Sequence, residues 1–232
     1  MRRVLVTGGN RGIGLELVRH LLARGDKVVA AVRHPARANE LTLQAAAHPG
    51  HLHVLPLDVT KPASIHELAK EAALVVDGLD LLINNAGLLP SGERFGHLDS
   101  HALEAAFRTN AMGPLLLSEA LTPLLRRGQQ AWIANISTVM GSITETREFR
   151  TPSYAISKAA LNMVTRLLAA ALREHGIGVL ALHPGWVQTA MGGAQAPVPA
   201  ATSAAGLLRV IDAAALEQSG SFLDYQGQSL PW

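Results

Sequence analysis

Short apolar runs rich in β-branched residues alternate along the chain with longer segments in which apolar residues recur every three or four positions. The short runs predict strands and the longer segments predict helices. Regular alternation of the two is typical of βα units, in which parallel strands form one sheet and helices cover both of its faces. The pattern therefore predicts an α/β fold with a doubly wound parallel sheet of about seven strands.

The boundaries of these elements follow from the same pattern. We expect strands at residues 3–7, 27–33, 52–58, 79–84, 132–137, 178–183 and 222–224. We expect helices at residues 12–23, 36–46, 62–76, 100–125, 152–174 and 204–217. No low-complexity linker and no internal repeat divides the chain, so residues 1–232 are interpreted as one domain.

Composition narrows the class of protein. With 48% hydrophobic and 16% charged residues, a disordered chain is excluded. The 20 basic and 18 acidic residues nearly balance, no long basic run occurs and aromatic residues make up 4%, so we expect no nucleic-acid binding. The absence of cysteine excludes disulfides, thiolate metal sites and a cysteine nucleophile, and fits a cytoplasmic location. Prolines and glycines interrupt the uncharged stretch 175–208, so we expect no membrane span.

A glycine-rich turn follows the first predicted strand and opens the first predicted helix. Gly8, Gly12 and Gly14 allow a tight turn, a close approach of the backbone to a ligand, and close packing of the helix on the sheet. Unpaired N–H groups at the start of such a helix bind the pyrophosphate of a dinucleotide. The spacing is GxxxGxG, which differs from the common GxGxxG, and a tight turn without any ligand is the alternative interpretation.

Tyr154 and Lys158 are candidates for acid–base chemistry. They are four positions apart near the start of a predicted helix, so both side chains project from one face. The pKa of a free tyrosine, about 10, is too high for proton transfer at neutral pH, and a lysine cation and the helix N-terminus are both expected to lower it. The alternative is an ordinary pair on an exposed helix face. Ser137 ends a predicted buried strand, where ligands of such sheets bind, although serines also cap loops.

These motifs occur together and in order along the whole chain. They comprise residues 7–14, Asn84-Asn85-Ala86-Gly87, Asn110, Ser137, Tyr154-x-x-x-Lys158 and Pro184-Gly185. In this combination the sequence resembles the short-chain dehydrogenase/reductase family. Residues 183–189 and 222–232 are similar to the branch that contains the C-factor and the sniffer-type carbonyl reductases.

The resemblance implies a Rossmann-type fold and an NADPH-dependent oxidoreductase that transfers hydride to a ketone or aldehyde, or oxidises the alcohol in reverse. It implies that Tyr154 exchanges the proton and that Ser137 orients the substrate oxygen. Lys158 would lower the pKa of Tyr154 and bind the ribose, and Asn110 would hold a relay water. The residues implied in cofactor binding are Gly8, Asn10, Arg11, Gly12, Ile13, Gly14, Arg33, Asp58, Val59, Asn85, Ala86, Gly87, Tyr154, Lys158, Pro184, Gly185, Val187 and Thr189.

The form of the cofactor can be argued from charge. NAD-binding members of such folds place an acidic residue roughly 20 positions after the glycines, on the ribose 2′-hydroxyl, and an arginine accommodates the 2′-phosphate of NADP. Arg33 stands at that distance, Arg11 lies within the glycine turn, and no acidic residue occurs between Lys27 and Asn39. We therefore expect NADP(H), unless these arginines are merely solvated surface charges.

The family also suggests features outside the reactive residues. Two long helices rich in alanine and leucine, at 100–125 and 152–174, correspond to those that form dimers or tetramers in the family, so we expect a homo-oligomer. Residues 189–205 are expected to form a short substrate lid, with an open pocket. The polar stretch 145–150 looks like an inserted loop, which either shapes the entrance or extends into solvent.

The same sequence features allow alternative functions to be compared. A dinucleotide-binding regulator or cell-signalling protein with little turnover is the main alternative, although such proteins tend to lose the reactive tyrosine or lysine. A sugar-nucleotide epimerase usually has a longer chain and GxxGxxG spacing, which would need glycine at Arg11. The chain contains 10 histidines, but they lack acidic or thiol partners in a strong motif, so we expect no metal site.

Overall fold

A seven-stranded parallel sheet forms the centre of the computed structural model, which describes residues 1–232. Its strands lie in the order β3-β2-β1-β4-β5-β6-β9. Their bounds are Arg3–Thr7 (β1), Lys27–Val32 (β2), Leu52–Pro56 (β3), Leu81–Asn84 (β4), Trp132–Ile136 (β5), Gly178–His183 (β6) and Ser221–Asp224 (β9). The predicted fold class, a doubly wound Rossmann-like sheet, is confirmed.

The strand order indicates where on this sheet a ligand binds. The chain moves outward from β1 to β2 and β3 and then returns to the other side of β1 to form β4. Because every pair is parallel, all strands end at the same edge. The crevice outside the carboxyl ends of β1 and β4, where the order reverses, is where ligands bind in open α/β sheets.

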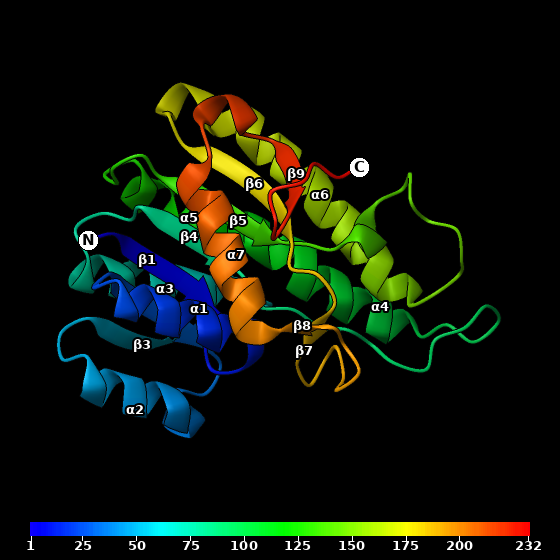
Figure 1. Ribbon diagram of the computed structural model, residues 1–232, viewed down its shortest axis with the longest axis horizontal. Helices are drawn as coiled ribbons and strands as arrows, with labels where there is room; N and C mark the ends of the chain where they lie inside the picture. Colours follow the sequence, from blue (N-terminus) through cyan, green and yellow to red (C-terminus); the bar gives the residue numbers. More distant parts are fainter.

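Helices cover both faces of the sheet (Figure 1). Hydrophobic residues of α1, α2 and α7 pack on one face, and those of α3, α5 and α6 pack on the other. α4 packs against α6. The bounds of the helices are Gly12–Ala23 (α1), Asn39–Ala47 (α2), Pro62–Val75 (α3), Ser100–Phe107 (α4), Gly113–Leu125 (α5), Pro152–Leu172 (α6) and Ala200–Ala213 (α7).

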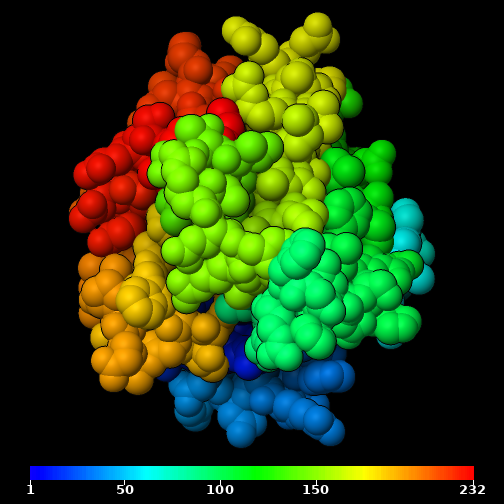
Figure 2. Space-filling model, turned by 90° about the vertical axis from the view of Figure 1, so that its right-hand side faces the viewer, coloured from blue at the N-terminus to red at the C-terminus, as the bar shows by residue number.

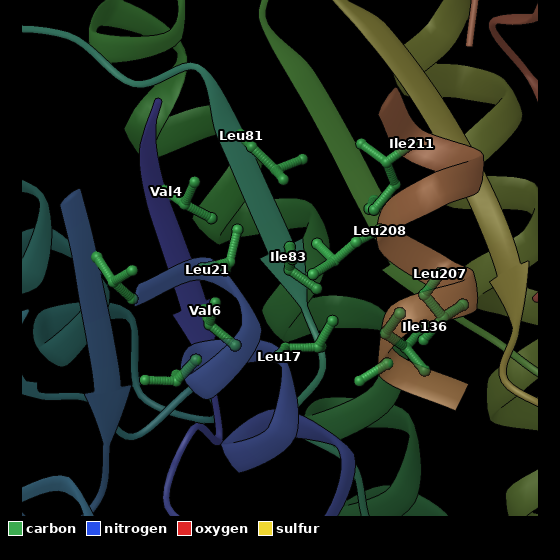
Figure 3. Packing of buried hydrophobic residues seen from close by; sticks show 14 of the residues in the cluster. Val4, Val6, Leu17, Leu21, Leu81, Ile83, Ile136, Leu207, Leu208 and Ile211 are labelled. Carbon is green, nitrogen blue, oxygen red and sulfur yellow. The ribbon is translucent and has the colours of Figure 1, made fainter. Parts of the chain in front are cut away.

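In the core on the α1 and α7 side of the sheet, alternate residues of a strand point to opposite faces (Figure 3). Val4 and Val6 of β1 point to this face, and Leu5 between them points to the other. Leu17 and Leu21 are one turn apart on α1 and face the same core. Complete burial of such side chains contributes about 1.5–3 kcal/mol each, which fixes the helices over the sheet.

One predicted helix is interrupted in the structure. The sequence predicts a single helix over 100–125, whereas the structure has α4, a π-helical turn at Arg108–Met112, and then α5. Pro114 explains part of this difference because it has no N–H, so the carbonyl of Asn110 lacks its α-helical donor four residues on. π-turns of this kind are frequent at functional sites.

Two further differences concern the segment after β6. A short parallel pair, β7 (Val187–Gln188) and β8 (Val198–Pro199), is absent from the prediction because each strand has only two residues. α7 begins at Ala200 and not at residue 204. Within the expected lid at residues 189–205, the irregular segment lies between β7 and β8, and the residues from Ala200 onward are helical.

The segment Pro152–His175 is long and apolar enough to cross a membrane by length and composition alone. Half of its most apolar window is buried inside the protein, however. It includes α6, whose Leu161, Leu168 and Leu172 belong to the same buried cluster as residues of α5 and the sheet. These contacts identify it as a core helix of the α/β fold.

Candidate active site

The turn between β1 and α1 needs glycine for two different reasons. Gly8 and Gly12 have φ angles of +68° and +55°, in the left-handed region that disfavours other residues. Gly14 has ordinary backbone angles, but a Cβ atom there would lie 2.2 Å from the carbonyl oxygen of Gly8. The turn therefore brings the backbone at the start of α1 directly against the backbone that follows β1.

Hydrogen bonds join this turn to the end of β4. The hydroxyl of Thr7 accepts from the backbone N–H groups of Asn85 and Ala86, each at 3.0 Å. The side-chain amide of Asn85 donates to the carbonyl of Thr7 at 2.9 Å and to that of Gly8 at 3.3 Å. The crevice at the β1–β4 switch point is thus held in shape by side chains that the sequence motifs single out.

The positive charge at the turn between β1 and α1 fits a bound dinucleotide phosphate. α1 has no side-chain hydrogen bond at its N-cap, Arg11, and no acidic residue in its first turn. Arg11 and Arg33 are exposed and form no ion pair, whereas Arg3 is paired with Asp80 at 2.7 Å. Free helix N–H groups bind a pyrophosphate, and unpaired guanidinium groups suit a further phosphate. The residues present therefore fit an NADP-type cofactor.

Ser137, Tyr154 and Lys158 are brought together by β5 and α6. Ser137 follows the last residue of β5 and is buried. Lys158 is 4% exposed, and its Nζ atom lies 5.7 Å from the centroid of the Tyr154 ring. The same Nζ atom donates a hydrogen bond of 2.6 Å to the carbonyl of Ile136. The lysine therefore links the strand that carries Ser137 to the helix that carries Tyr154.

Burial controls the protonation of this pair. It raises the pKa of Tyr154 to about 12 and lowers the pKa of Lys158 to about 7. The expectation that a lysine cation and the helix N-terminus lower the pKa of Tyr154 is wrong for the protein on its own, because removal from water disfavours both charged forms. At neutral pH the phenol keeps its proton, which is the form that a proton donor needs.

The lowered pKa of Lys158 predicts a pH-dependent stability. Between pH 7 and the ordinary lysine pKa of 10.5, the unfolded chain binds more protons at Lys158 than the folded chain, so this group makes the free energy of unfolding rise with pH. We expect Lys158→Met to be more stable than the wild type at pH 7, by about 1.4 kcal/mol for each unit of pKa shift it relieves. This gain should disappear towards pH 10.5.

Thermal unfolding of both proteins at pH 7 and pH 10 measures this gain. Lys70→Met is the matched control, because Lys70 is 75% exposed on α3 and its replacement should have the same small effect at both pH values. An equal gain for Lys158→Met at both pH values would contradict the assignment of a buried amine.

Asn110 lies within the π-helical turn and is completely buried. Its side-chain oxygen accepts from Leu88 N–H at 2.8 Å, and its amide donates to the carbonyl of Leu88 at 2.8 Å and to the Ser157 hydroxyl at 2.9 Å. Ser157 in turn donates to the carbonyl of Tyr154 at 2.7 Å. The Asn110 side chain is thus occupied by protein partners.

The remaining predicted cofactor residues lie along the same edge of the sheet. Asp58 and Val59 follow β3, and the Asp58 carboxylate accepts from the N–H and hydroxyl of Thr60 at 3.1 and 2.7 Å. Thr189 follows β7, and its methyl group lies close to Gly12. Asn10 belongs to the glycine turn, Ile13 to the first turn of α1, Gly87 follows β4, Pro184 and Gly185 follow β6, and Val187 begins β7.

One buried residue next to the reactive group was not predicted from the sequence. The Ser137 hydroxyl donates a hydrogen bond of 2.6 Å to the side-chain oxygen of Asn162, which is 4% exposed. Asn162 lies one helical turn beyond Lys158, on the same face of α6. A polar residue that continues the four-residue spacing of Tyr154 and Lys158 is the signal that could have identified it.

Three segments border the entrance to the site. They lie between β4 and α4, between β5 and α6, and between β7 and β8. Figure 2 shows a hollow between them, in green, yellow-green and orange, with dark-blue residues of the N-terminal part at its base. The rings of Phe95 and Phe149 join the first two segments edge to face at 5.5 Å, and the carboxylate of Glu93 accepts from the hydroxyl of Ser153. The polar loop at 145–150 thus borders the entrance.

Comparison with known proteins identifies the family to which this chain belongs. The family model described as short chain dehydrogenase matches residues 2–198. The chain belongs to the short-chain dehydrogenase/reductase family. C-signal of Myxococcus xanthus is 44% identical over 154 residues, which cover 66% of this chain and 93% of that protein.

Solved structures of short-chain dehydrogenases/reductases are similar over the whole chain. The NADPH-bound carbonyl reductase from chicken fatty liver has a TM-score of 0.95 and 41% identity, and the aligned region covers 100% of this chain and 99% of that one. The carbonyl reductase Sniffer of Drosophila melanogaster has a TM-score of 0.95 and 33% identity, with 100% of both chains covered. The resemblance to the C-factor and sniffer-type branch is therefore confirmed.

Proposed function

We propose that this short-chain dehydrogenase/reductase uses NADPH to reduce a ketone or aldehyde to an alcohol, and catalyses the reverse oxidation with NADP. The observation that carries the proposal is the position of Tyr154 and Lys158 on one face of α6, beside Ser137 and at the edge of the sheet where the glycine turn lies. The relationship to carbonyl reductases supports it.

We assign each reactive residue one role in this reaction. Tyr154, which is protonated at neutral pH, gives its proton to the substrate oxygen. Ser137 orients that oxygen. Lys158, whose lowered pKa of about 7 allows it to gain and lose a proton near neutrality, returns a proton to Tyr154 and binds the ribose. The backbone carbonyl of Asn110 holds a water that connects Lys158 to solvent.

We assign the binding of NADPH to the β1–α1 turn and to the residues that follow β2, β3, β4 and β6. When bound, the cofactor supplies a hydride. The α1 N-terminus holds the pyrophosphate, and Arg11 and Arg33 hold the 2′-phosphate. Asp58 and Val59 contact the adenine, Asn85 to Gly87 line the crevice, and Pro184, Gly185, Val187 and Thr189 lie on the nicotinamide side.

The loss of NADPH absorbance in the presence of a panel of aldehydes, ketones, quinones and diketones tests the function. We expect at least one class of carbonyl to give turnover that depends on both enzyme and carbonyl. Saturable NADPH binding without oxidation by any member of the panel would overturn the reductase proposal.

That negative result would favour the second candidate, a regulator or signalling protein that responds to cofactor occupancy. The similarity to C-signal is the observation that favours it. The presence of both Tyr154 and Lys158 favours the enzyme, because a protein that only binds the cofactor has no need of a proton donor.

The proposal includes an oligomer, a lid and a cytoplasmic location. Apolar side chains of α4 and α6 are exposed, among them Phe107 at 45% and Met163 at 60%, and we propose that they form a homodimer or homotetramer interface. Residues 189–205 would act as a short substrate lid within a one-domain protein. Light scattering at micromolar concentration measures the oligomer, and a monomer there would contradict it.

A further inference from the structure

The orientation of the Asn162 side chain is fixed by its two hydrogen bonds. Its amide nitrogen donates to the carbonyl of Gly141 at 3.1 Å, and its oxygen faces the Ser137 hydroxyl at 2.6 Å. Gly141 lies directly against α6, because a Cβ atom there would lie 2.7 Å from the backbone of Lys158. A flipped amide would bring two carbonyl oxygens together without a hydrogen between them.

This orientation fixes the direction of the Ser137 hydrogen bond. The oxygen of Asn162 can only accept, so the single proton of the Ser137 hydroxyl points towards α6. Ser137 is 1% exposed and therefore has no bulk water as an alternative partner. Its remaining lone pairs are free to accept a hydrogen bond from a molecule in the site.

We propose that Asn162 is a positioning residue that makes Ser137 a hydrogen-bond acceptor, so that Ser137 binds the alcohol form of the substrate in preference to the carbonyl form. The inference rests on the carbonyl reduction proposed above. An alcohol hydroxyl donates to Ser137 while Ser137 donates to Asn162. A carbonyl oxygen has no proton to donate, so Ser137 must leave Asn162 before it can bind a carbonyl.

Removal of the acceptor should therefore affect the two substrate forms in opposite directions. In Asn162→Leu the Ser137 proton is released. We expect the inhibition constant of the product alcohol to rise by about 2- to 10-fold, the effect of one neutral hydrogen bond. The KM of the carbonyl should stay the same or fall, and the affinity for NADPH should not change.

The measurement compares the alcohol inhibition constant with the carbonyl KM in the wild type and in Asn162→Leu. Asn162→Ala, which adds no bulk, is the second variant, and thermal unfolding shows that each variant is folded. A purely structural role would raise both constants together. Parallel changes, or no change in their ratio, would overturn the inference.

A double-mutant cycle tests whether Asn162 acts through Ser137. With Ser137→Ala already present, Asn162→Leu should change the alcohol inhibition constant no further, whereas additive effects would contradict the mechanism. Thr165→Val is the matched control. It removes the neighbouring link between β5 and α6, in which the Asn135 amide donates to the Thr165 hydroxyl at 2.9 Å, and should leave the ratio of the two constants unchanged.

The outcomes separate this inference from the proposed function. If no carbonyl gives turnover in the wild type, the proposed function fails and the inference is overturned with it. If turnover is present but the ratio of the two constants is the same in the wild type and in both Asn162 variants, the inference alone is overturned.

Discussion

Tyr154→Phe should lower kcat for carbonyl reduction by about 10²- to 10⁴-fold, the usual contribution of a positioned proton donor. The substitution removes one hydroxyl and keeps the ring, so contacts that bind the cofactor are largely retained. We therefore expect NADPH affinity within a few-fold of the wild type. Steady-state turnover and fluorescence titration with NADPH measure the two effects separately.

The chain offers a matched control for this variant. Tyr225 is its other tyrosine, and its ring packs against Gly185 at the end of β6. Tyr225→Phe should retain wild-type turnover, because the ring contact is kept and no reactive role is assigned to its hydroxyl. If Tyr154→Phe kept half of the wild-type kcat with a substrate whose hydride transfer is shown by isotope effect to limit the rate, Tyr154 would not be the proton donor. Lys158→Ala, in contrast, should impair turnover and NADPH affinity together, since two roles are assigned to Lys158.

Arg33→Asp should shift the choice of cofactor from NADPH towards NADH. A charge-assisted hydrogen bond contributes about 1.5–3 kcal/mol, which corresponds to a wild-type preference for NADPH of roughly 10- to 150-fold. Aspartate at this position would repel the 2′-phosphate and accept a hydrogen bond from the free 2′-hydroxyl of NADH. The ratio of kcat/KM with the two cofactors, measured at moderate salt, reports the change.

The control for Arg33→Asp is the same substitution at an arginine that lies far from the proposed cofactor site. Arg173 is exposed and precedes β6, so it lies towards the opposite edge of the sheet. Arg173→Asp should leave the cofactor ratio unchanged. Equal use of NADPH and NADH by the wild type would overturn the assignment of Arg11 and Arg33 without affecting the role of Tyr154.

The local sequence pattern was sufficient to predict most of the fold. β1 and α1 begin and end where the sequence predicts, because a run of apolar residues passes directly into glycines and then into an amphipathic helix. The π-helical turn at Arg108–Met112 was missed, since it depends on the distant partners of Asn110 as well as on Pro114. Pro114 within a predicted helix was a local warning of the break.

The reactive residues were predictable as a set, but their electrostatics were not. Spacing places Tyr154 and Lys158 on one helix face, and the structure brings them beside Ser137. The direction of their pKa shifts depends on how much protein surrounds them, which no spacing reveals. Asn162 escaped prediction for a similar reason, because its importance arises from its contact with Ser137, which is far away in the sequence.

The reactive groups and the border of the entrance belong to different parts of the chain. Ser137, Lys158 and Asn162 are tied together by buried hydrogen bonds between β5 and α6, whereas the loop at 142–151 is largely exposed. We expect changes in the sequence or length of that loop to alter which molecules fit and to leave the buried hydrogen bonds intact. We therefore expect a library of variants confined to this loop to differ in substrate choice while most members still fold, so the loop is the place to begin directed evolution of this protein.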